Sequence, residues 1–447
     1  MIPHTPKGTV VVLGGGLAGL STLWHLQRAG YDSSFLFEKE SRVGGLARSE
    51  DVAGFTFDYT GHLLHFNRPA IQQLVEKLLG ENLRFLPRNS WVYSKGVYTR
   101  YPFQTNLYGL PPQVIEECIS GYIEATQSKS PCSTQTKNPS DYPSFADWID
   151  RTLGSGIARH FMTPYNEKLW TIPLQELTCE WMGRFVPTTS LEQILDGARE
   201  DCKHRSGYNA RFGYPIRGGI EALPRAFSRQ LRQIHTGYEA VEIDPKDKLV
   251  TFSNGETMRF QVLVSTLPLP RLICAIKEAP ATIRAAASRL RFTSVFNVNF
   301  GVKRSLGDRH WIYVPEPEFL FYRIGFSHNF SPYQAPTGCS SIYAEVAYSL
   351  WRPLDKSQAA ARVKADLVKA RILEERDEIV AECCLDIPWA YVIYDHGTRQ
   401  AVDQIQNYLL GLGIWSIGRY GAWEYSGMDE AIWQGKLVAD RIIEGSH

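Results

Sequence analysis

The glycine spacing near the N-terminus constrains the fold of this chain more than any other feature. Gly14, Gly16 and Gly19 form a G-x-G-x-x-G pattern. A short buried strand is expected at residues 9–13 before it, and residues 20–29 follow it with the apolar spacing of a helix. Glycines at these positions permit a tight turn and let backbone N–H groups approach a pyrophosphate at the helix N-terminus. The pattern therefore predicts a dinucleotide-binding βαβ unit; a glycine-rich turn without a ligand is the alternative.

The next strand is expected at residues 34–38. Its last residue and the residues that follow it indicate which dinucleotide is bound. Glu38 ends that strand, and a carboxylate there can accept both ribose hydroxyls and repel a 2′-phosphate, which argues against NADP. A second glycine pair, Gly44 and Gly45, follows within residues 42–48. This pair resembles the extended FAD signature of the flavoprotein group that includes amine oxidases. The resemblance implies that the chain passes close to the diphosphate of FAD here.

Two later segments resemble further parts of the same flavoproteins. Residues 264–268 resemble a strand-to-turn segment that recurs late in those proteins. Gly418 and Arg419, followed by Met428 and Asp429 at the start of an expected helix, resemble their C-terminal flavin motif. A helix N-terminus there can offer N–H groups and positive potential to the anionic edge of a reduced flavin. We therefore expect FAD as the cofactor.

The order of expected elements indicates an α/β fold in which a Rossmann-like FAD-binding domain carries two insertions. Strands are expected at residues 239–243, 249–252, 262–265, 296–302, 342–348 and 414–417, a turn at Asn254–Gly255, and a helix at 429–443. The apolar spacing predicts that residues 105–200 are mostly helical, with a polar surface loop at 126–144. One helical face should carry Trp148, Ile149, Leu153 and Ile157. The expected domains are a discontinuous FAD-binding domain (1–100, 205–290 and 400–447), a helical substrate domain (101–204) and a mainly antiparallel sheet substrate domain (291–399).

Composition indicates which partners are not expected and in which compartment the protein works. The formal net charge of +1 gives no overall field that would favour nucleic acid or an acidic membrane. No apolar run approaches the ~18 residues of a membrane span. The eight cysteines contain no C-x-x-C pair, so no metal site is expected. We expect a soluble, cytoplasmic protein that binds neither nucleic acid nor membrane.

Several blocks of sequence are similar to UDP-galactopyranose mutases, especially to the eukaryotic branch of that family. The similarity extends from the N-terminus to about residue 443 and includes residues 213–219. The blocks that carry it are Tyr101-Pro-Phe-Gln104, Pro164-Tyr-Asn-Glu-Lys-Leu-Trp170, Trp181-Met-Gly-Arg184, Phe321-Tyr-Arg323 and Ser331-Pro-Tyr333.

The resemblance implies a nucleotide-sugar site in which separate residues bind the base, the diphosphate and the sugar. Tyr101 and Phe103 would form an aromatic platform for the base, and stacking of this kind contributes roughly 1–3 kcal/mol per base. The amide of Gln104 would pair with a uracil edge. Arg184 and Arg323 match the two diphosphate-binding arginines of the family, and arginine suits this task because it is always charged and binds two oxygens at once.

The remaining substrate residues follow from the same resemblance. Tyr313 and Tyr391 correspond to tyrosines that touch the phosphates, and Asn166 and Trp170 correspond to residues on the sugar side. Tyr425 is expected to contact substrate as well. Gly61 and His62 match a glycine–histidine loop near the reactive face of the flavin, and His62, Arg184 and Arg323 are the expected catalytic residues. The expected cofactor-binding residues are Gly14, Gly16, Gly19, Glu38, Lys39, Gly44, Gly45, Leu46, Arg48, Gly61, His62, Val241, Ser265, Gly418, Arg419, Met428 and Asp429.

The chain also departs from the pattern of this family. Phe330 stands where the eukaryotic branch has a tyrosine, and residues 392–396 differ from the proline-rich run of the family. The C-terminus is shorter, at a place where the family has helices for higher oligomers; a homodimer is a possible state. These departures leave the identity of the sugar, and that of the base, open.

The resemblance implies a flavin-dependent mutase that interconverts the pyranose and furanose forms of a UDP-linked sugar. In that mechanism N5 of the reduced flavin attacks the anomeric carbon and displaces the nucleoside diphosphate, after which the sugar ring opens and recloses through another hydroxyl. The flavin must be in its reduced form, so the expected partners are the nucleotide sugar and a nicotinamide or other electron donor.

Two alternatives share the flavin motifs. One is an FAD-dependent oxidoreductase of the amine oxidase or protoporphyrinogen oxidase type, and the other is a flavin-binding protein without catalysis. The two loop arginines and the Tyr-Pro-Phe-Gln block favour the mutase, because an oxidase of apolar substrates does not need them.

Overall fold

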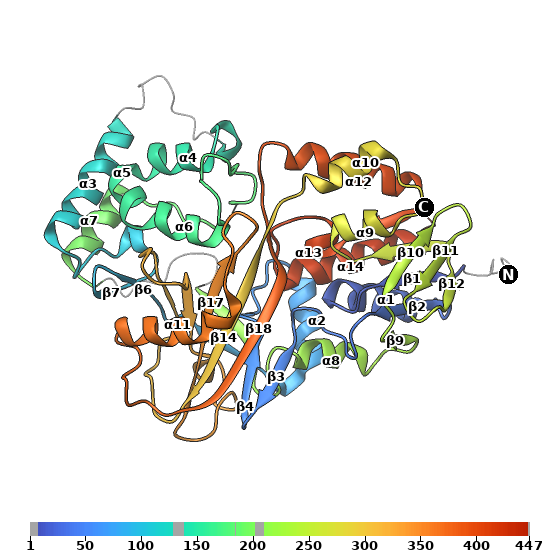
Figure 1. Ribbon diagram of the computed structural model, residues 1–447, viewed down its shortest axis with the longest axis horizontal. Coiled ribbons are helices and arrows are strands. Elements are labelled where there is room, and N and C mark those ends of the chain that lie inside the picture. The colour runs from blue at the N-terminus through green and yellow to red at the C-terminus, as the bar shows by residue number, and fades with distance from the viewer. Residues whose placement is uncertain (1–7, 128–137, 184, 202–209, 446–447) are drawn as a thin grey trace.

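A five-stranded, fully parallel sheet forms the half of the molecule that carries the first glycine loop (Figure 1). The computed structural model describes residues 8–127, 138–183, 185–201 and 210–445. The strand order confirms the Rossmann-like fold expected from the glycine spacing. In that order the strands are β19 (Ile414–Ser416), β13 (Val262–Ser265), β1 (Val10–Leu13), β2 (Ser34–Glu38) and β9 (Ile234–Thr236).

The sequence of β1 explains its central position in this sheet. All four of its residues are buried, as expected for a parallel strand that is covered on both faces. α1 (Leu17–Arg28) follows the glycine turn, and Gly30 just after it has a φ of +79°. α14 (Met428–Ile443) packs along α1, so the N-terminal and C-terminal motifs meet although they are far apart in sequence. At the crossing a Cβ on Gly435 would lie 2.4 Å from the carbonyl oxygen of Ala18.

A small antiparallel sheet extends from this half of the molecule. Its strands are β10 (Ala240–Asp244), β11 (Leu249–Phe252) and β12 (Thr257–Arg259). The turn at residues 254–255 was expected, and Gly255 has a φ of +85° there. α9 (Leu269–Ala275), α10 (Ala281–Ser288) and α12 (Thr398–Gly411) pack together beside it (Figure 1).

The second half is built on a seven-stranded, mainly antiparallel sheet. One face of this sheet packs on α11 (Lys356–Lys369), through apolar residues such as Ile324, Ala344 and Val363. Side chains alternate between faces along a strand, so Arg323, Tyr343 and Glu345 point away from α11. The strand order is β18 (Ile379–Val392), β14 (Phe292–Val302), β17 (Ser340–Tyr348), β16 (Arg323–Gly325), β15 (Trp311–Tyr313), β6 (Ser90–Ser94) and β7 (Val97–Arg100).

The hairpin of β6 and β7 lies in this second sheet, although the expected boundary at residue 100 assigned it to the FAD-binding domain. β6 pairs in parallel with β15, with Ser90 opposite Trp311. The alternation of a hairpin predicts its strands but not the sheet that they join. Two further pairs connect the halves: β3 (Ser49–Val52) with β4 (Phe55–Asp58), and β5 (Leu83–Pro87) with β8 (Arg211–Pro215).

A helical layer lies above the edge of the seven-stranded sheet (Figure 1). Trp148, Ile149, Leu153 and Ile157, expected on one face, are all buried. Residues 128–137, which make up much of the expected polar loop at 126–144, lie outside the described residues. The layer consists of α3 (Pro112–Gln127), α4 (Phe145–Thr152), α5 (Gly154–Ile157), a π-helical turn (Ala158–Met162), α6 (Thr163–Trp170) and α7 (Leu191–Arg199). In the described part of the chain, no helix has the length and apolarity to cross a membrane.

The contact between α1 and α14 predicts a stability difference between two glycine substitutions. Gly435→Ala should lower the free energy of unfolding by about 1–3 kcal/mol, because the added methyl group overpacks the crossing. Gly411→Ala is the matched control: it ends α12 with no atom within 4 Å of its added Cβ, so it should stabilise by about 0.4–1 kcal/mol. Chemical denaturation followed by circular dichroism measures both, and equal stability of the two variants would contradict the packing argument.

Candidate active site

A cavity of about 1120 Å³ lies where the parallel sheet, the helical layer and the seven-stranded sheet meet. Residues of all three regions line it, from Gly14 after β1 to Asn166 on α6 and Arg323 on β16. Pockets for a single small ligand are typically about 300–1,000 Å³. The cavity is therefore large enough for a dinucleotide and a second ligand. Within the described residues, no three His, Cys, Asp or Glu side chains gather where they could hold a metal ion.

The two glycine loops form one end of the cavity through direct backbone contact. A Cβ on Gly16 would meet no atom closer than Gly45 Cα, at 4.0 Å, so the space in front of this residue is open. The amide of Gly44 donates to the carbonyl of Gly15 at 2.8 Å and joins the loops. Gly19 does not line the cavity; its added Cβ would lie 2.0 Å from the carbonyl oxygen of Gly14, so its role is helix packing.

Glu38 lies at the same end, with its carboxylate held by the backbone. Oε2 accepts from the amide of Gly15 at 2.6 Å, and Oε1 accepts from the amide of Glu40 at 2.9 Å. Lys39 and Val241 also line this part of the cavity. The backbone thus holds both carboxylate oxygens of Glu38 in place, as is required if they are to accept hydrogen bonds from the two hydroxyls of a ribose.

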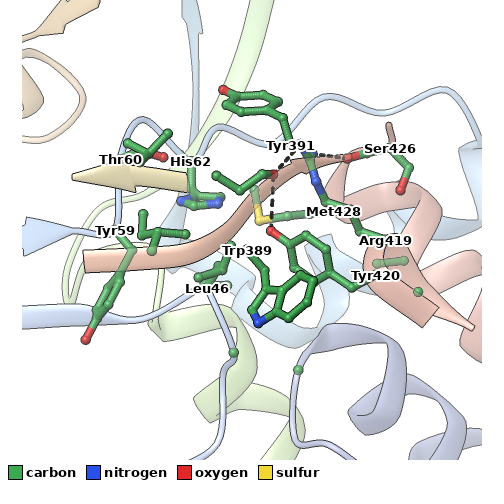
Figure 2. Close-up of a pocket in the computed structure, with 18 of the residues that line it drawn as sticks. Leu46, Tyr59, Thr60, His62, Trp389, Tyr391, Arg419, Tyr420, Ser426 and Met428 are labelled. Carbon is green, nitrogen blue, oxygen red and sulfur yellow. Dashed lines mark hydrogen bonds between the residues drawn. The ribbon is translucent and has the colours of Figure 1, made fainter. Parts of the chain in front are cut away.

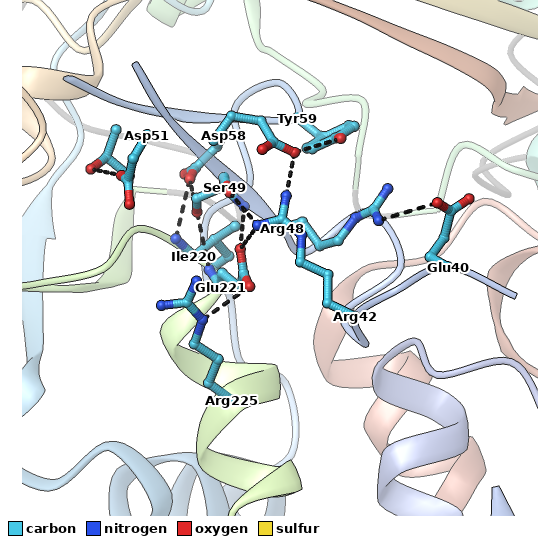
Figure 3. Close-up of polar contacts among 12 residues, drawn as sticks. Glu40, Arg42, Arg48, Ser49, Asp51, Asp58, Tyr59, Ile220, Glu221 and Arg225 are labelled. Carbon is cyan, nitrogen blue, oxygen red and sulfur yellow. Dashed lines mark hydrogen bonds and ion pairs between the residues drawn. The ribbon is translucent and has the colours of Figure 1, made fainter. Parts of the chain in front are cut away.

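A network of charges positions the second glycine loop (Figure 3). The buried Glu221 accepts from the amide of Ser49 at 2.9 Å and from Arg42 at 3.2 Å, and Arg42 also contacts Glu50. The guanidinium of Arg48 lies 5.0 Å from the ring of Tyr59. These contacts fix residues 42–50 on both sides of the loop, so that Leu46 and Arg48 line the cavity as expected.

The C-terminal motif places a buried cation, Arg419, in the wall of the cavity (Figure 2). Arg419 donates from Nη1 to the carbonyl of Ser426 at 2.7 Å and from Nη2 to that of Ala390 at 3.0 Å. Its Nε is buried without a partner, and in the described residues it forms no ion pair with a carboxylate. Its positive charge therefore remains available to a ligand.

Met428 and Gly418 line the cavity beside Arg419, but two other expected cofactor residues do not. The carboxylate of Asp429 accepts from the amide and the side chain of Asn67, and so connects α14 to the segment before α2 (Pro69–Leu79). Ser265 is fully buried at the end of β13, and its neighbour Thr266 faces the cavity instead.

His62 lies on the cavity wall next to Gly61 (Figure 2). Burial, together with the positive charges of Arg419 and Arg323, lowers the pKa of its imidazole to about 4. The ring is therefore neutral near pH 7, and its Nδ1 is buried without a hydrogen bond in the described residues. A neutral imidazole can offer a donor or an acceptor to a ligand, according to its tautomer.

The cavity face of the seven-stranded sheet carries the expected diphosphate residues. Tyr313, Arg323 and Glu345 lie opposite one another on β15, β16 and β17. Arg323 makes a two-pronged ion pair with the fully buried Glu345, at 2.9 and 2.7 Å. This ion pair could not be predicted from the sequence, because it depends on the register between two strands. Residue 184, the other expected arginine, lies outside the described residues.

The expected base platform is arranged differently from the prediction. Tyr101 lines the cavity but stacks on Tyr313, with ring centroids 4.5 Å apart. Phe103 is fully buried, stacks on Phe161 at 5.0 Å and does not line the cavity. Phe103 therefore packs in the core, and Phe161 and Tyr165, which are themselves buried, supply aromatic rings to the cavity wall.

Of the other expected substrate residues, four line the cavity and one packs behind them. Gln104 and Asn166 line the cavity, and each amide nitrogen donates to a backbone carbonyl, at 2.7 Å in both cases. Tyr391 and Tyr425 also line it and stack on each other at 5.8 Å. Trp170 does not reach the cavity; it is fully buried and packs edge-on against Tyr391.

Comparison with known proteins places this geometry in a family. The sequence matches the model of the flavin containing amine oxidoreductase family over residues 17–443. The chain belongs to this family.

The most informative similarities are to one solved structure and two curated sequences. A crystal structure of reduced UDP-galactopyranose mutase has a TM-score of 0.92 and 29% identity, covering 98% of this chain and 94% of that chain. The Dictyostelium discoideum protein named "Probable flavin-containing monoamine oxidase A" is 23% identical over 61% of this chain and 59% of its own length. Coproporphyrinogen III oxidase of Mycobacterium bovis is 34% identical over 43% of this chain and 37% of its own length. The chain thus covers less than two thirds of both curated relatives.

Family membership implies a flavin cofactor for this flavoprotein, and the residues of the cavity fit one. The open space before Gly16 suits a phosphate group at the N-terminus of α1. The unpaired Nε of Arg419 and Nδ1 of His62 are buried polar atoms that a ligand would satisfy.

Sequence reasoning missed several cavity residues of this flavoprotein. Tyr165, Tyr343 and Trp389 line the cavity, yet lone aromatic residues in a sequence give no signal that separates a cavity wall from a core. Phe330, the departure from the family pattern, is buried in the core and lies outside the cavity wall.

The glycine geometry predicts opposite outcomes for two neighbouring substitutions. Gly16→Ala should preserve the fold but reduce flavin content, because its methyl group enters the open space in front of the loop. Gly19→Ala should lower the melting temperature, because its methyl group collides with the Gly14 carbonyl. Flavin absorbance per mole of protein and thermal unfolding measure the two effects. A Gly16→Ala protein with full flavin content would show that this space does not receive the cofactor.

Proposed function

We propose that this flavoprotein is a nucleotide-sugar mutase that interconverts the pyranose and furanose forms of a UDP-linked sugar. The observation that carries this proposal is the pairing of two unlike walls in one cavity. A flavin-compatible part of the wall bears Arg419 and His62, and the sheet adds Tyr313 and Arg323 to the wall of the same cavity. The 29% identity to UDP-galactopyranose mutase over almost the whole chain supports the same reading.

We propose FAD as the flavin. The glycine loops would receive its diphosphate, Glu38 its ribose, and the wall of Arg419 and His62 its ring system. A mononucleotide that ends at one phosphate would not need a second glycine loop joined to the first by an amide hydrogen bond. The cavity also continues past Glu38 to Val241.

The bound flavin, once reduced, would supply the nucleophile for ring interconversion, without net loss of electrons. The protein then has to orient and stabilise. Arg419 provides a fixed positive charge toward an anionic reduced flavin, and the neutral His62 adds a hydrogen-bonding group without a second charge.

The substrate wall would recognise base and diphosphate separately. Nε2 of Gln104 is committed to the carbonyl of Pro187, which leaves Oε1 to accept from the N3–H of uracil. Arg323 and the hydroxyls of Tyr313 and Tyr391 would hold the diphosphate, which is the leaving group. Arg184 is proposed for the same task on the strength of the sequence pattern.

An oxidase is the second candidate function, because both curated relatives carry oxidase names. It would use the same flavin wall and reduce the flavin with its substrate. The buried ion pair of Arg323 beside the cavity is a charged feature that such chemistry does not need.

The proposed chemistry predicts activity only after reduction. Anaerobic protein treated with dithionite or a nicotinamide donor should isomerise UDP-galactose over many turnovers per reduction, with neither oxygen nor donor consumed in proportion to product. Chromatography of the nucleotide sugars measures the ring isomers.

The oxidised protein is the control for this experiment and should be inactive. An oxidase would behave in the opposite way, because substrate would bleach the oxidised flavin and one oxidant would be used per turnover. Rapid bleaching by an amine or a porphyrinogen, together with no isomerisation of any nucleotide sugar, would replace the mutase by the oxidase.

The diphosphate role of Arg323 can be tested apart from the stability of its ion pair. A lone Arg323→Ala change would leave Glu345 as a buried unpaired carboxylate, which costs about 3–5 kcal/mol of stability. The double variant Arg323→Met with Glu345→Gln avoids this charge and should bind UDP about 10- to 150-fold more weakly, as expected for lost charge-assisted hydrogen bonds.

Glu345→Gln alone is the matched control for this test. It keeps Arg323 and removes the competing negative charge, so UDP should bind at least as tightly as to the unmodified protein. Titration of the flavin spectrum with UDP measures both, with flavin content as the check on folding. Unchanged UDP affinity in the double variant would reject the assignment.

A further inference from the structure

The cavity face of the seven-stranded sheet carries a second row of residues next to the row of Arg323. Trp311, Gly325 and Tyr343 lie opposite one another on β15, β16 and β17. Because residues two apart on a strand point to the same face, this row faces the cavity too, and both Trp311 and Tyr343 line it. The proposed function above assigns no role to this row.

Two glycines from separate elements make room for the ring of Tyr343. A Cβ on Gly325 would lie 1.9 Å from Cζ of this tyrosine, and a Cβ on Gly61 would lie 2.3 Å from its hydroxyl oxygen. A side chain at either position would therefore displace the ring. The slot fixes the phenol in one place, which is the arrangement expected of a group that must be positioned accurately.

The hydroxyl of Tyr343 is left for a ligand. The side chain is 4% exposed, yet it lines the cavity, and its oxygen lies against Gly61, which lines the cavity as well. Among the described residues, no group forms a hydrogen bond with this hydroxyl, although buried tyrosines usually have a partner. Burial raises the pKa of Tyr343, so the phenol stays protonated and can both donate and accept.

The position of this hydroxyl identifies the part of the ligand that it can reach. On one side lies Arg323, the proposed diphosphate residue, and on the other lies the loop of Gly61 and His62 on the flavin wall. In a nucleotide sugar whose anomeric carbon reacts at a flavin, the sugar occupies the space between these two.

We propose that Tyr343 is a specificity-determining residue whose hydroxyl hydrogen-bonds a hydroxyl group of the substrate sugar. This proposal rests on the proposed function, since it requires a nucleotide sugar in the cavity. It assigns the sugar contact to β17, which is a different element from the one that carries Asn166.

The test compares UDP with UDP-galactose on flavin-loaded protein. Tyr343→Phe keeps the ring in its slot and removes only the hydroxyl. The variant should bind UDP-galactose about 5- to 20-fold more weakly and UDP with about the original affinity, because only the sugar loses a hydrogen bond. Calorimetry or titration of the flavin spectrum measures both ligands. Tyr93→Phe is the matched control, since it removes a buried hydroxyl from β6 of the same sheet outside the cavity wall.

Monodeoxy analogues of UDP-galactose identify the contact. The analogue that lacks the hydroxyl contacted by Tyr343 should bind the unmodified protein and Tyr343→Phe equally, because it cannot form this hydrogen bond with either protein. The unmodified protein should discriminate against that analogue.

The outcomes separate this proposal from the proposed function. If neither UDP nor UDP-galactose binds any of the proteins, the nucleotide-sugar function itself fails. If both bind and Tyr343→Phe leaves the ratio of their affinities unchanged, the role of Tyr343 is rejected while the mutase survives. Loss of flavin from Tyr343→Phe would also reject it, because the hydroxyl would then be structural.

Discussion

The close approach of the two glycine loops is the contact on which the flavin half depends. Gly16 and Gly45 face each other with no side chain between them, and the Gly44 amide joins the loops by a hydrogen bond to Gly15. Gly19 lets α1 settle onto the first of these loops, because a Cβ on it would lie 2.0 Å from the Gly14 carbonyl oxygen. The backbone of the first loop also positions Glu38 at this end of the cavity, because the amide of Gly15 donates a hydrogen bond to its carboxylate.

Arg419 and Arg323, which both line the cavity, are held in different electrostatic states. Arg419 is bound by two backbone carbonyls, so its charge is oriented but not neutralised. Arg323 is paired with the buried Glu345, so a ligand diphosphate has to compete with a carboxylate for it. A permanent cation beside a flavin and a shared cation beside a leaving group suit their proposed tasks. The first must remain constant through the reaction, whereas the second must bind and then release a diphosphate.

The sequence was sufficient for the parts of this architecture that local pattern determines. The βαβ unit, the turn at Gly255 and the helix that starts near Met428 follow from glycine positions and apolar spacing, and the structure confirms them. Pairing between distant strands could not be predicted, because alternation fixes which residues share a face but not which strands are neighbours. For that reason the ion pair of Arg323, the slot of Tyr343 and the sheet that receives β6 all became visible only in the structure.

The same limit explains the misplaced base platform. An aromatic residue beside a motif can stand in the cavity or behind it, and Phe103 stands behind it. The block of residues 164–170 shows a further reason why such motifs carry more than ligand contacts. The buried Lys168 donates to the carbonyls of Val314 and Glu316, each at 2.9 Å, and burial lowers its pKa to about 7. It thereby ties α6, with Asn166 on it, to the end of the strand that holds Tyr313. A lysine in this position costs desolvation energy, and its two hydrogen bonds hold together the helix and the strand that carry the proposed sugar-side and phosphate-side residues.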